Sequence, residues 1–341
     1  MSKNRNSIWR SAMGFAIALP ILQIAALPAF GQERGPLTLA KSSYFFVGGG
    51  IDTSLEGSPM VGQMYVEYMI PQRQRHPYPV VMVHGGGQTG TNFTGTPDGR
   101  EGWAQYFVRR GYAVYVVDQV ARGRAAYWDQ AFGALPPARL SFVEQRFVAP
   151  EQDPKWPQAH LHTQFPGAGN PGDGDFDQFY ASQFPSIASF PQQQQLNRAA
   201  LVALLDKIGP AIVLVHSQSG AYGLDLIRQH ADKVRAFVDV EGSCGPLSAD
   251  DVAKSFRKVP TAIVFGDFTE GSNGPNNDER RKLCSDSVAA INGAGGTAKF
   301  MYLPALGIKG NGHMMMMEKN NLQIADLIID WLGQTTAFAK N

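Results

Sequence analysis

Short apolar runs that alternate with helical segments constrain the fold of this chain more than any other feature. Runs of about four to eight apolar residues are typical of strands buried on both faces of a sheet. They occur at Val80–Val83, Tyr112–Val117, Ala211–His216, Arg235–Val240, Thr261–Phe265 and Lys299–Leu303. Helical patterns cover Gly102–Arg109, Gln192–Ile208, Tyr222–His230, Asp278–Ile291 and Asn320–Leu332. The alternation predicts an α/β fold, with a mainly parallel central sheet flanked by helices.

Two stretches depart from this alternation. Ser43–Val47 and Met64–Ile70 flank a glycine-rich turn region and predict an antiparallel pair that opens the sheet. From about residue 119 to residue 191 the chain is rich in proline, glycine, glutamine and aromatic residues and has weak periodicity. Such a length is too great for a simple connection, so we expect a cap or lid insertion at about 119–191.

The N-terminus has the pattern of a secretory signal peptide. Three cations precede residue 11, an apolar stretch covers Ala12–Leu27, and Ala29-Phe30-Gly31 offers a small-residue cleavage site. Pro20 and Gln23 interrupt the apolar stretch, which disfavours the alternative of an uncleaved membrane anchor. We therefore expect a signal peptide at 1–31 and a periplasmic or secreted catalytic domain at 32–341, with no later membrane span.

Charge and composition narrow the possible partners. Loss of the three cations in residues 1–31 changes the formal net charge from +1 to −2, and no basic block remains. Nucleic acid is therefore not an expected partner. The sequence contains no zinc-type Cys/His spacing and no phosphate-binding Gly-Lys-Ser/Thr, so we expect no metal and no cofactor. Nothing in the sequence sets the oligomeric state.

Cys244 and Cys284 are the only cysteines of the chain. Two buried free thiols are one interpretation of such a pair. In an oxidising compartment, however, an isolated pair indicates one disulfide. Together with the export signal, the pair predicts a Cys244–Cys284 bond.

The segment from Val213 to Ala221 has the pattern of a nucleophile elbow. An apolar strand runs into Ser219, which has small residues two positions away on both sides, at Ser217 and Ala221, and a helix follows. Small neighbours allow strand and helix to approach closely, and the strained turn exposes the serine hydroxyl above the strand ends. Ser217 is the rival nucleophile, but bulky Val215 precedes it by two residues. The pattern therefore favours Ser219.

Glycines follow the Val80–Val83 strand in the sequence His84-Gly85-Gly86-Gly87. Such glycines leave backbone N–H groups free to converge on an oxyanion. We expect one donor at Gly86 or Gly87 and the other at Gly220, the residue after the predicted nucleophile. A flexible loop without this role is the alternative.

The chain contains seven histidines, and one has the position of a general base. His313 follows the last strand in Gly310-Asn311-Gly312-His313 and lies C-terminal to the nucleophile, where a loop can reach the serine hydroxyl. His84 and His216 belong to the oxyanion and elbow segments and are expected to support them. The sequence therefore predicts His313 as the base.

These motifs resemble the α/β-hydrolase fold superfamily of serine esterases and lipases, from about Ser43 to Leu332. Within it the chain is most similar to secreted bacterial carboxylesterases with the triad acid after the sixth strand. The usual acid follows the seventh strand, where this chain has Thr269 in the acid's position. The resemblance implies that Glu241, directly after the sixth strand, is the acid, with Asp267 as the alternative. It also implies that the cysteine pair fixes the loop of Glu241 against the helix after the seventh strand.

The resemblance implies a serine carboxylic-ester hydrolase that acts through an acyl-enzyme on a small-molecule ester. Ser219 would be the nucleophile, His313 the base and Glu241 the acid. A lactonase or peptidase on the same triad is one alternative. A binding module that kept the fold and lost the chemistry is another, although the serine, histidine and glycines are all present.

Overall fold

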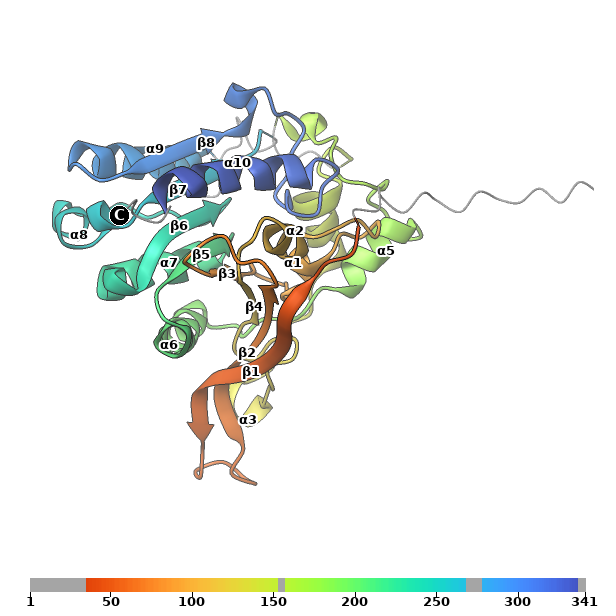
Figure 1. The fold of residues 1–341 in the computed structure, drawn as a ribbon. Coiled ribbons are helices and arrows are strands. Elements are labelled where there is room, and N and C mark those ends of the chain that lie inside the picture. The colour runs from red at the N-terminus through yellow and green to blue at the C-terminus, as the bar shows by residue number, and fades with distance from the viewer. Residues whose placement is uncertain (1–34, 153–156, 268–277, 337–341) are drawn as a thin grey trace, which may run out of the picture.

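The computed structural model describes residues 35–152, 157–267 and 278–336. The predicted signal peptide and Thr269 lie outside these residues. An eight-stranded sheet with the order β1-β2-β4-β3-β5-β6-β7-β8 forms the centre (Figure 1). Its strands are β1 Leu39–Ile51, β2 Met60–Pro71, β3 Val80–Val83, β4 Val114–Asp118, β5 Ala211–His216, β6 Val234–Val240, β7 Thr261–Phe265 and β8 Ala298–Tyr302.

The strand pairings agree with the sequence expectation. β2 is antiparallel to both β1 and β4, whereas all pairings from β4 through β3, β5, β6 and β7 to β8 are parallel. The predicted opening pair is confirmed, with Val47 opposite Met64. Every residue of β3, β5 and β7 is buried, as expected for strands covered on both faces.

Helices cover both faces of the sheet. The longer ones are α2 Trp103–Arg109, α5 Gly174–Ala181, α6 Phe190–Ile208, α7 Ser219–His230, α8 Ala249–Lys254, α9 Asp278–Gly293 and α10 Asn321–Thr335. The short ones are α1 Thr91–Thr94, α3 Asp129–Phe132, α4 Leu140–Val143, η1 Glu144–Val148, η2 Ala159–Leu161, η3 Ala231–Lys233, η4 Phe256–Lys258 and η5 Leu303–Leu306. The α/β-hydrolase fold expected from the sequence is confirmed.

Alternating strand residues divide the core into two main layers. Ile212 and Leu214 of β5 pack in one cluster with residues of α2 and α10, whereas Val213 and Val215 pack in the other with residues of α6 and α7. This division follows from the two-residue period of a strand. The run Met314–Met317 is buried in the first cluster and is therefore part of the core.

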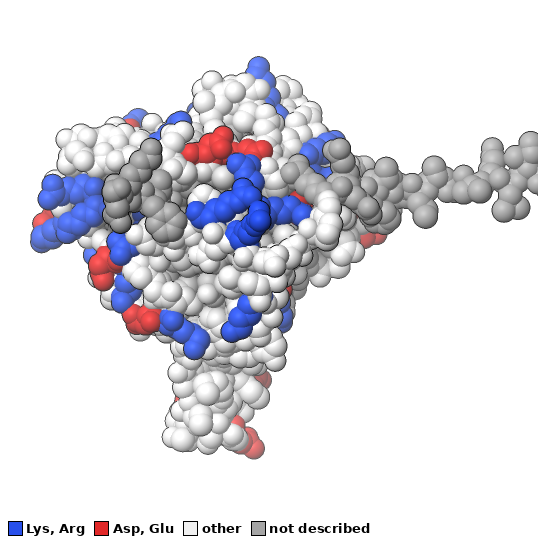
Figure 2. Space-filling view, viewed as in Figure 1, with Lys and Arg blue, Asp and Glu red and all other residues white. Residues whose placement is uncertain are grey.

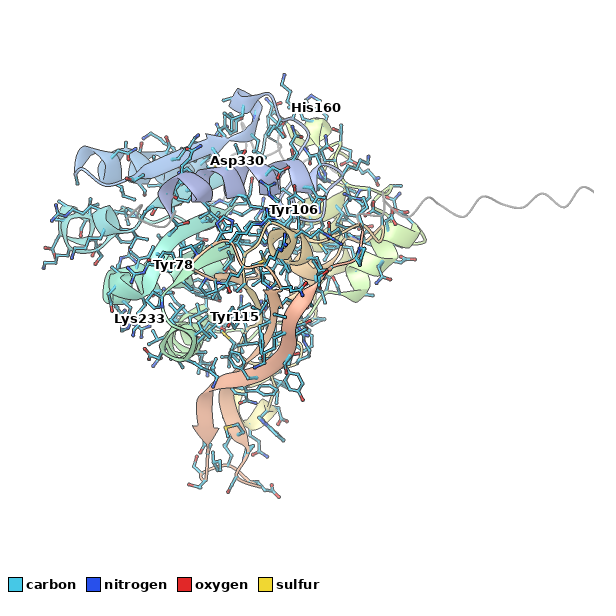
Figure 3. The ribbon with its side chains drawn as sticks, in the orientation of Figure 1. Tyr78, Tyr106, Tyr115, His160, Lys233 and Asp330 are labelled. Atoms are coloured by element: carbon cyan, nitrogen blue, oxygen red, sulfur yellow. A yellow bond between two sulfur atoms is a disulfide. The ribbon has the colours of Figure 1, made fainter. Side chains whose placement is uncertain are left out.

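Polar contacts join the two helices on the first face. Tyr106 of α2 and Asp330 of α10 both lie on this side of the sheet (Figure 3). The Tyr106 hydroxyl donates a hydrogen bond to Asp326, and Arg110 forms ion pairs with Asp326 and Asp330.

Figure 2 shows basic side chains near the centre of this face beside a group of acidic ones. The hairpin of β1 and β2 extends away from the body and carries few charges in the same view.

Residues 119–189, called the cap segment from here on, connect β4 to α6. Their described part contains the helices from α3 to α5 and no strand. Phe147, Phe165, Phe176 and Phe179 of this segment are buried in the same cluster as the sheet and α10. The segment is therefore packed on the core, while its division into a separate cap domain stays a prediction.

Candidate active site

Ser217 occupies a sharp turn between β5 and α7. The strand ends at His216, the helix begins at Ser219, and Ser217 has a φ of 56°. A non-glycine residue in this region is strained and persists only where its surroundings hold it. Here the Ser217 N–H donates to Val240 O at 3.0 Å, and the Gly220 N–H donates to Ser217 O at 3.0 Å. This is the strand–turn–helix geometry of a nucleophile elbow, with Ser217 at its tip.

Three polar side chains from different loops form a continuous chain at this turn. Ser217 Oγ lies 2.7 Å from His313 Nε2, and His313 Nδ1 lies 3.1 Å from Glu241 Oε2. His313 and Glu241 are almost completely buried. The structure thus brings together a serine hydroxyl, an imidazole and a carboxylate in the order that nucleophilic catalysis requires.

Ser219 does not take part in this chain. Its hydroxyl is fully buried, accepts a hydrogen bond from His216 N at 3.0 Å and lies 2.9 Å from Val83 O and 2.8 Å from His216 O. The predicted placement of Ser219 above the strand ends is therefore wrong. The elbow lies two residues earlier, and Ser219 is the small residue on its helical side.

Ser217 was disfavoured in the sequence because bulky Val215 stands two residues before it, where an elbow usually has a small residue. Val215 tolerates the elbow because its side chain points into the second core layer rather than toward the turn. Close approach of strand and helix depends instead on Gly223 of α7. A Cβ atom at Gly223 would lie 2.3 Å from the Phe237 ring and 3.3 Å from Val215 Cγ1. The informative signal was the end of the apolar run, which makes Ser217 the first residue after the strand.

Glu241 follows β6 directly and has a φ of 49°. Its Oε1 accepts a hydrogen bond from Gly266 N at 2.9 Å, and its Oε2 accepts one from Arg280 Nη2 at 3.2 Å. Burial raises the pKa of Glu241, while Arg280 acts in the opposite direction. Asp267, the alternative acid, instead accepts a hydrogen bond from Gly310 N at 3.0 Å. Of the two carboxylates, Glu241 contacts the histidine.

The disulfide lies beside this carboxylate. Cys244 and Cys284 are joined by a disulfide, as the sequence predicts. The bond connects the loop after Glu241 to α9, the helix that also carries Arg280. Loop and helix therefore hold the Glu241–Arg280 pair from both sides.

The environment of His313 favours its neutral form. Burial lowers its pKa well below the usual value, and the positive charges of Arg146 and Arg280 act in the same direction. Phe147 stacks on the imidazole, with ring centroids 5.6 Å apart and planes 8° from parallel. A neutral imidazole can accept a proton from Ser217.

A buried glutamate that the sequence did not single out holds the loop of His313. Glu318 Oε1 accepts a hydrogen bond from Gly312 N at 2.7 Å, and Oε2 accepts one from Asn311 Nδ2 at 2.7 Å. His162 Nε2, from the cap segment, lies 3.0 Å from Glu318 Oε1. Glu318 thus joins the loop of the histidine to the cap segment.

Of the three expected oxyanion donors, two line the cavity and one is used in a backbone turn. Gly86 and Gly87 both line the cavity at Ser217, and their role as oxyanion donors stays a prediction. The Gly220 N–H is not free to donate, because it already donates to Ser217 O in the turn that precedes α7. With Ser217 at the elbow, the following residue is Gln218, which also lines the cavity. The prediction for Gly220 is therefore wrong for the same reason as that for Ser219.

Two histidines and one arginine support these loops. His84 Nε2 accepts a hydrogen bond from Gln119 N at 3.1 Å, and His216 Nε2 donates to His313 O at 2.8 Å. Burial lowers the pKa of each to about 3, so both imidazoles are neutral. Buried Arg122 donates to Gly85 O at 2.7 Å and to Gln218 Oε1 at 2.8 Å. It thereby joins the glycine loop to the elbow.

A cavity of about 940 Å³ opens at Ser217. Besides the elbow and the glycine loop, its walls come mainly from the cap segment, where they include Phe142, Phe147 and Phe184. Within the described ranges no group of His, Cys, Asp and Glu side chains is arranged to hold a metal ion. No helix in those ranges is both long and apolar enough to span a bilayer.

Known proteins are similar to this chain in sequence and in fold. The chain is 37% identical over 335 residues to the probable secreted lipase phiG of a fungal species (strain ATCC 74256), with 85% of this chain and 89% of that protein covered. It is 34% identical to a bacterial esterase solved at atomic resolution, with a TM-score of 0.72 over 89% of this chain and 99% of the other. No family model matches the sequence.

Proposed function

Because this chain belongs to the α/β-hydrolase-fold family of esterases and lipases, we propose that it hydrolyses carboxylic esters through an acyl-enzyme on Ser217. The single observation that carries this proposal is the hydrogen-bonded chain from Ser217 Oγ through His313 to Glu241. The cavity at Ser217 provides room for a small-molecule ester.

The reaction follows from the positions of these groups. His313 Nε2 takes the proton of Ser217 as Oγ bonds to the ester carbonyl carbon, and the carbonyl electron pair moves to the oxygen. When the intermediate collapses, the alcohol leaves with the proton from His313. A water molecule, deprotonated by His313, then attacks the acyl-enzyme, and the acid is released as Ser217 regains its proton. Glu241 orients the imidazole and stabilises its charged form.

The oxyanion donors are assigned from the cavity wall. We place one donor at the N–H of Gln218, which follows the nucleophile, and the other at Gly86 or Gly87. Arg122 donates hydrogen bonds to the side chain of Gln218 and to the carbonyl oxygen of Gly85. This contact keeps the two donor segments at a fixed separation.

The test of the nucleophile compares two serines. Ser217→Ala should lower kcat by roughly a millionfold, as removal of a nucleophile does in a comparable triad. Ser219→Ala should keep most of the turnover, because its hydroxyl bonds only to backbone groups. Hydrolysis of p-nitrophenyl butyrate and labelling by a fluorophosphonate probe measure both effects. An inactive Ser219→Ala enzyme together with an active Ser217→Ala enzyme would refute this assignment.

The test of the acid compares two carboxylates. Glu241→Gln should lower kcat by roughly ten-thousandfold, the effect of removing the orienting charge in a related triad. Asp267→Asn should cost far less, because Asp267 contacts the backbone of the histidine loop and not the imidazole. Circular dichroism of both variants controls for folding. A larger loss from Asp267→Asn would place the acid after β7.

We also propose that the protein is exported. The support is the signal-peptide pattern of residues 1–31, the secreted relative and the Cys244–Cys284 bond. Mature protein from the native host should begin at or near Gln32. N-terminal mass analysis tests this, and an intact N-terminus in the exported protein would contradict cleavage.

A further inference from the structure

The cavity at Ser217 has an unusual charge distribution. Among the described residues that line it, three are arginines, namely Arg139, Arg146 and Arg280, and none is acidic. The same cavity contains Ser217 and His313. A neutral ester needs no cation in its binding cavity, and a buried charge is costly unless it is paired.

Arg280 is the most deeply buried of these three arginines. Its side chain comes from α9 and only 6% of the residue is exposed. Its Nη2 donates to Glu241 at 3.2 Å, whereas its Nε has no acceptor among the residues that the structure describes. Part of the hydrogen-bonding capacity of a buried guanidinium beside the reacting serine is thus unused.

Arg146 approaches the same place from the cap segment. It lies on η1, is partly buried and lines the cavity. Burial and then the repulsion of Arg280 lower its pKa to about 10. Two guanidinium groups from separate elements therefore converge on one cavity although each disfavours the charge of the other.

Two described carboxylates lie near these cations, and the charge of Glu241 favours the charged forms of both Arg146 and Arg280. Glu241 pairs with Arg280, and Asp239 is the other acidic residue that interacts with Arg280. Burial raises the pKa of Asp239 to about 7, so much of it is protonated at neutral pH. Neither carboxylate lines the cavity itself, so the charged side chains that an entering ligand meets among the described lining residues are arginines.

We propose that this cavity selects esters that carry a free carboxylate, which Arg146 and Arg280 bind while Ser217 attacks the ester carbonyl. The proposal rests on the proposed function and specifies its substrate class. A guanidinium presents its donors in a planar fork that matches a carboxylate. The carboxylate belongs either to the acyl part or to the alcohol part of the ester, and the two cases call for different probes.

The experiment compares matched esters in a pH-stat. Monomethyl adipate carries its carboxylate on the acyl part and is compared with methyl hexanoate. 4-Acetoxybutanoate carries it on the alcohol part and is compared with butyl acetate. We expect kcat/KM to favour the anion by about 10- to 100-fold in one of the two pairs, the gain typical of a hydrogen bond to a charged group. Added salt should reduce this preference.

Variants connect the preference to the cavity. Arg146→Gln should reduce the anion-to-neutral ratio by about tenfold or more. Arg257→Gln is the matched control, because Arg257 is exposed on η4 outside the cavity, and the ratio should stay unchanged. Arg280 is not substituted, since its loss would also disturb Glu241. A measurement on the unmodified enzyme covers the case in which Arg146→Gln does not fold: pentanoate should inhibit at a concentration about tenfold lower than pentanamide does.

The outcomes separate this proposal from the proposed function. Equal kcat/KM for both members of each pair, with hydrolysis that disappears in Ser217→Ala, would overturn the carboxylate preference and leave the esterase intact. Equal inhibition by pentanoate and pentanamide would overturn it as well. Absence of hydrolysis of all four esters and of p-nitrophenyl butyrate would instead refute the proposed function.

Discussion

Replacement of His162 by asparagine should remove a pH-dependent part of the stability of this protein. His162 is buried, with Nε2 3.0 Å from Glu318 Oε1 and Nδ1 3.6 Å from Glu151 Oε2. Burial alone would lower its pKa, but the adjacent carboxylates of Glu151 and Glu318 raise it to about 9. His162 is therefore a charged imidazolium at neutral pH.

The magnitude follows from the difference between folded and unfolded protein. The folded pKa of about 9 lies above the unfolded value of 6.5, so protonation of His162 stabilises the fold. At 1.36 kcal/mol for each pKa unit, the full contribution is about 3 kcal/mol. It is fully present below pH 6.5 and is lost as the pH rises through about 9. The unmodified protein should therefore have a higher free energy of unfolding than His162→Asn at about pH 6. This difference should shrink by about 3 kcal/mol by about pH 9.5.

Urea unfolding followed by circular dichroism measures this difference at each pH. His160→Asn is the matched control, because His160 lies two residues away and is exposed at the margin of the molecule (Figure 3). The control should follow the unmodified protein at every pH. A gap between His162→Asn and the unmodified protein that stays constant or widens toward alkaline pH would refute the assignment of a charged His162.

Three further outcomes follow from the structure. Replacing Cys244 and Cys284 by alanine should lower the free energy of unfolding by about 2–4 kcal/mol, because the bond closes a separation of 40 residues; equal urea midpoints would contradict this. Gly223→Ala should destabilise by about 1–3 kcal/mol, since its Cβ would meet the Phe237 ring at 2.3 Å, and an unchanged melting temperature would argue against that contact. The kcat/KM for a neutral ester should not fall between about pH 8 and about pH 6, because the low pKa of His313 keeps the base neutral; an apparent pKa near 6.5 would be inconsistent with its burial.

The sequence by itself determined the fold and the neighbourhood of the site. Apolar runs separated by helical patterns specify a parallel sheet, because strands buried on both faces must be apolar throughout. The chain order then places the turn after β5, the end of β6 and the loop after β8 at the same edge of the sheet, since parallel strands end together. This order was enough to single out His313, because its role depends on an element rather than on the orientation of one side chain. The family resemblance added Glu241, and an isolated cysteine pair behind an export signal predicted the disulfide.

Only the tertiary structure decided which serine faces the histidine. Ser217 and Ser219 are two residues apart in one turn, and the composition around them fits either choice. The positive φ of Ser217 turns its hydroxyl toward the cavity, whereas Ser219 begins α7 and points back to the end of β3. That rotation depends on a backbone hydrogen bond from Ser217 N to Val240 O, and Val240 belongs to a neighbouring strand. A local pattern carries no information about such a partner.

The arginines of the cavity and the buried ion pair were also decided by tertiary structure. Arg146, His162, Arg280 and Glu318 are residue types that usually lie on the surface or have no distinctive pattern in sequence. Here they are brought together from the cap segment, α9 and the loop before α10. Glu241 lies beside Arg280 and Glu318 lies beside His162, and these partners far along the chain offset part of the cost of desolvation. Whether a charged residue is exposed or buried beside such a partner depends on long-range packing, which short-range periodicity does not encode.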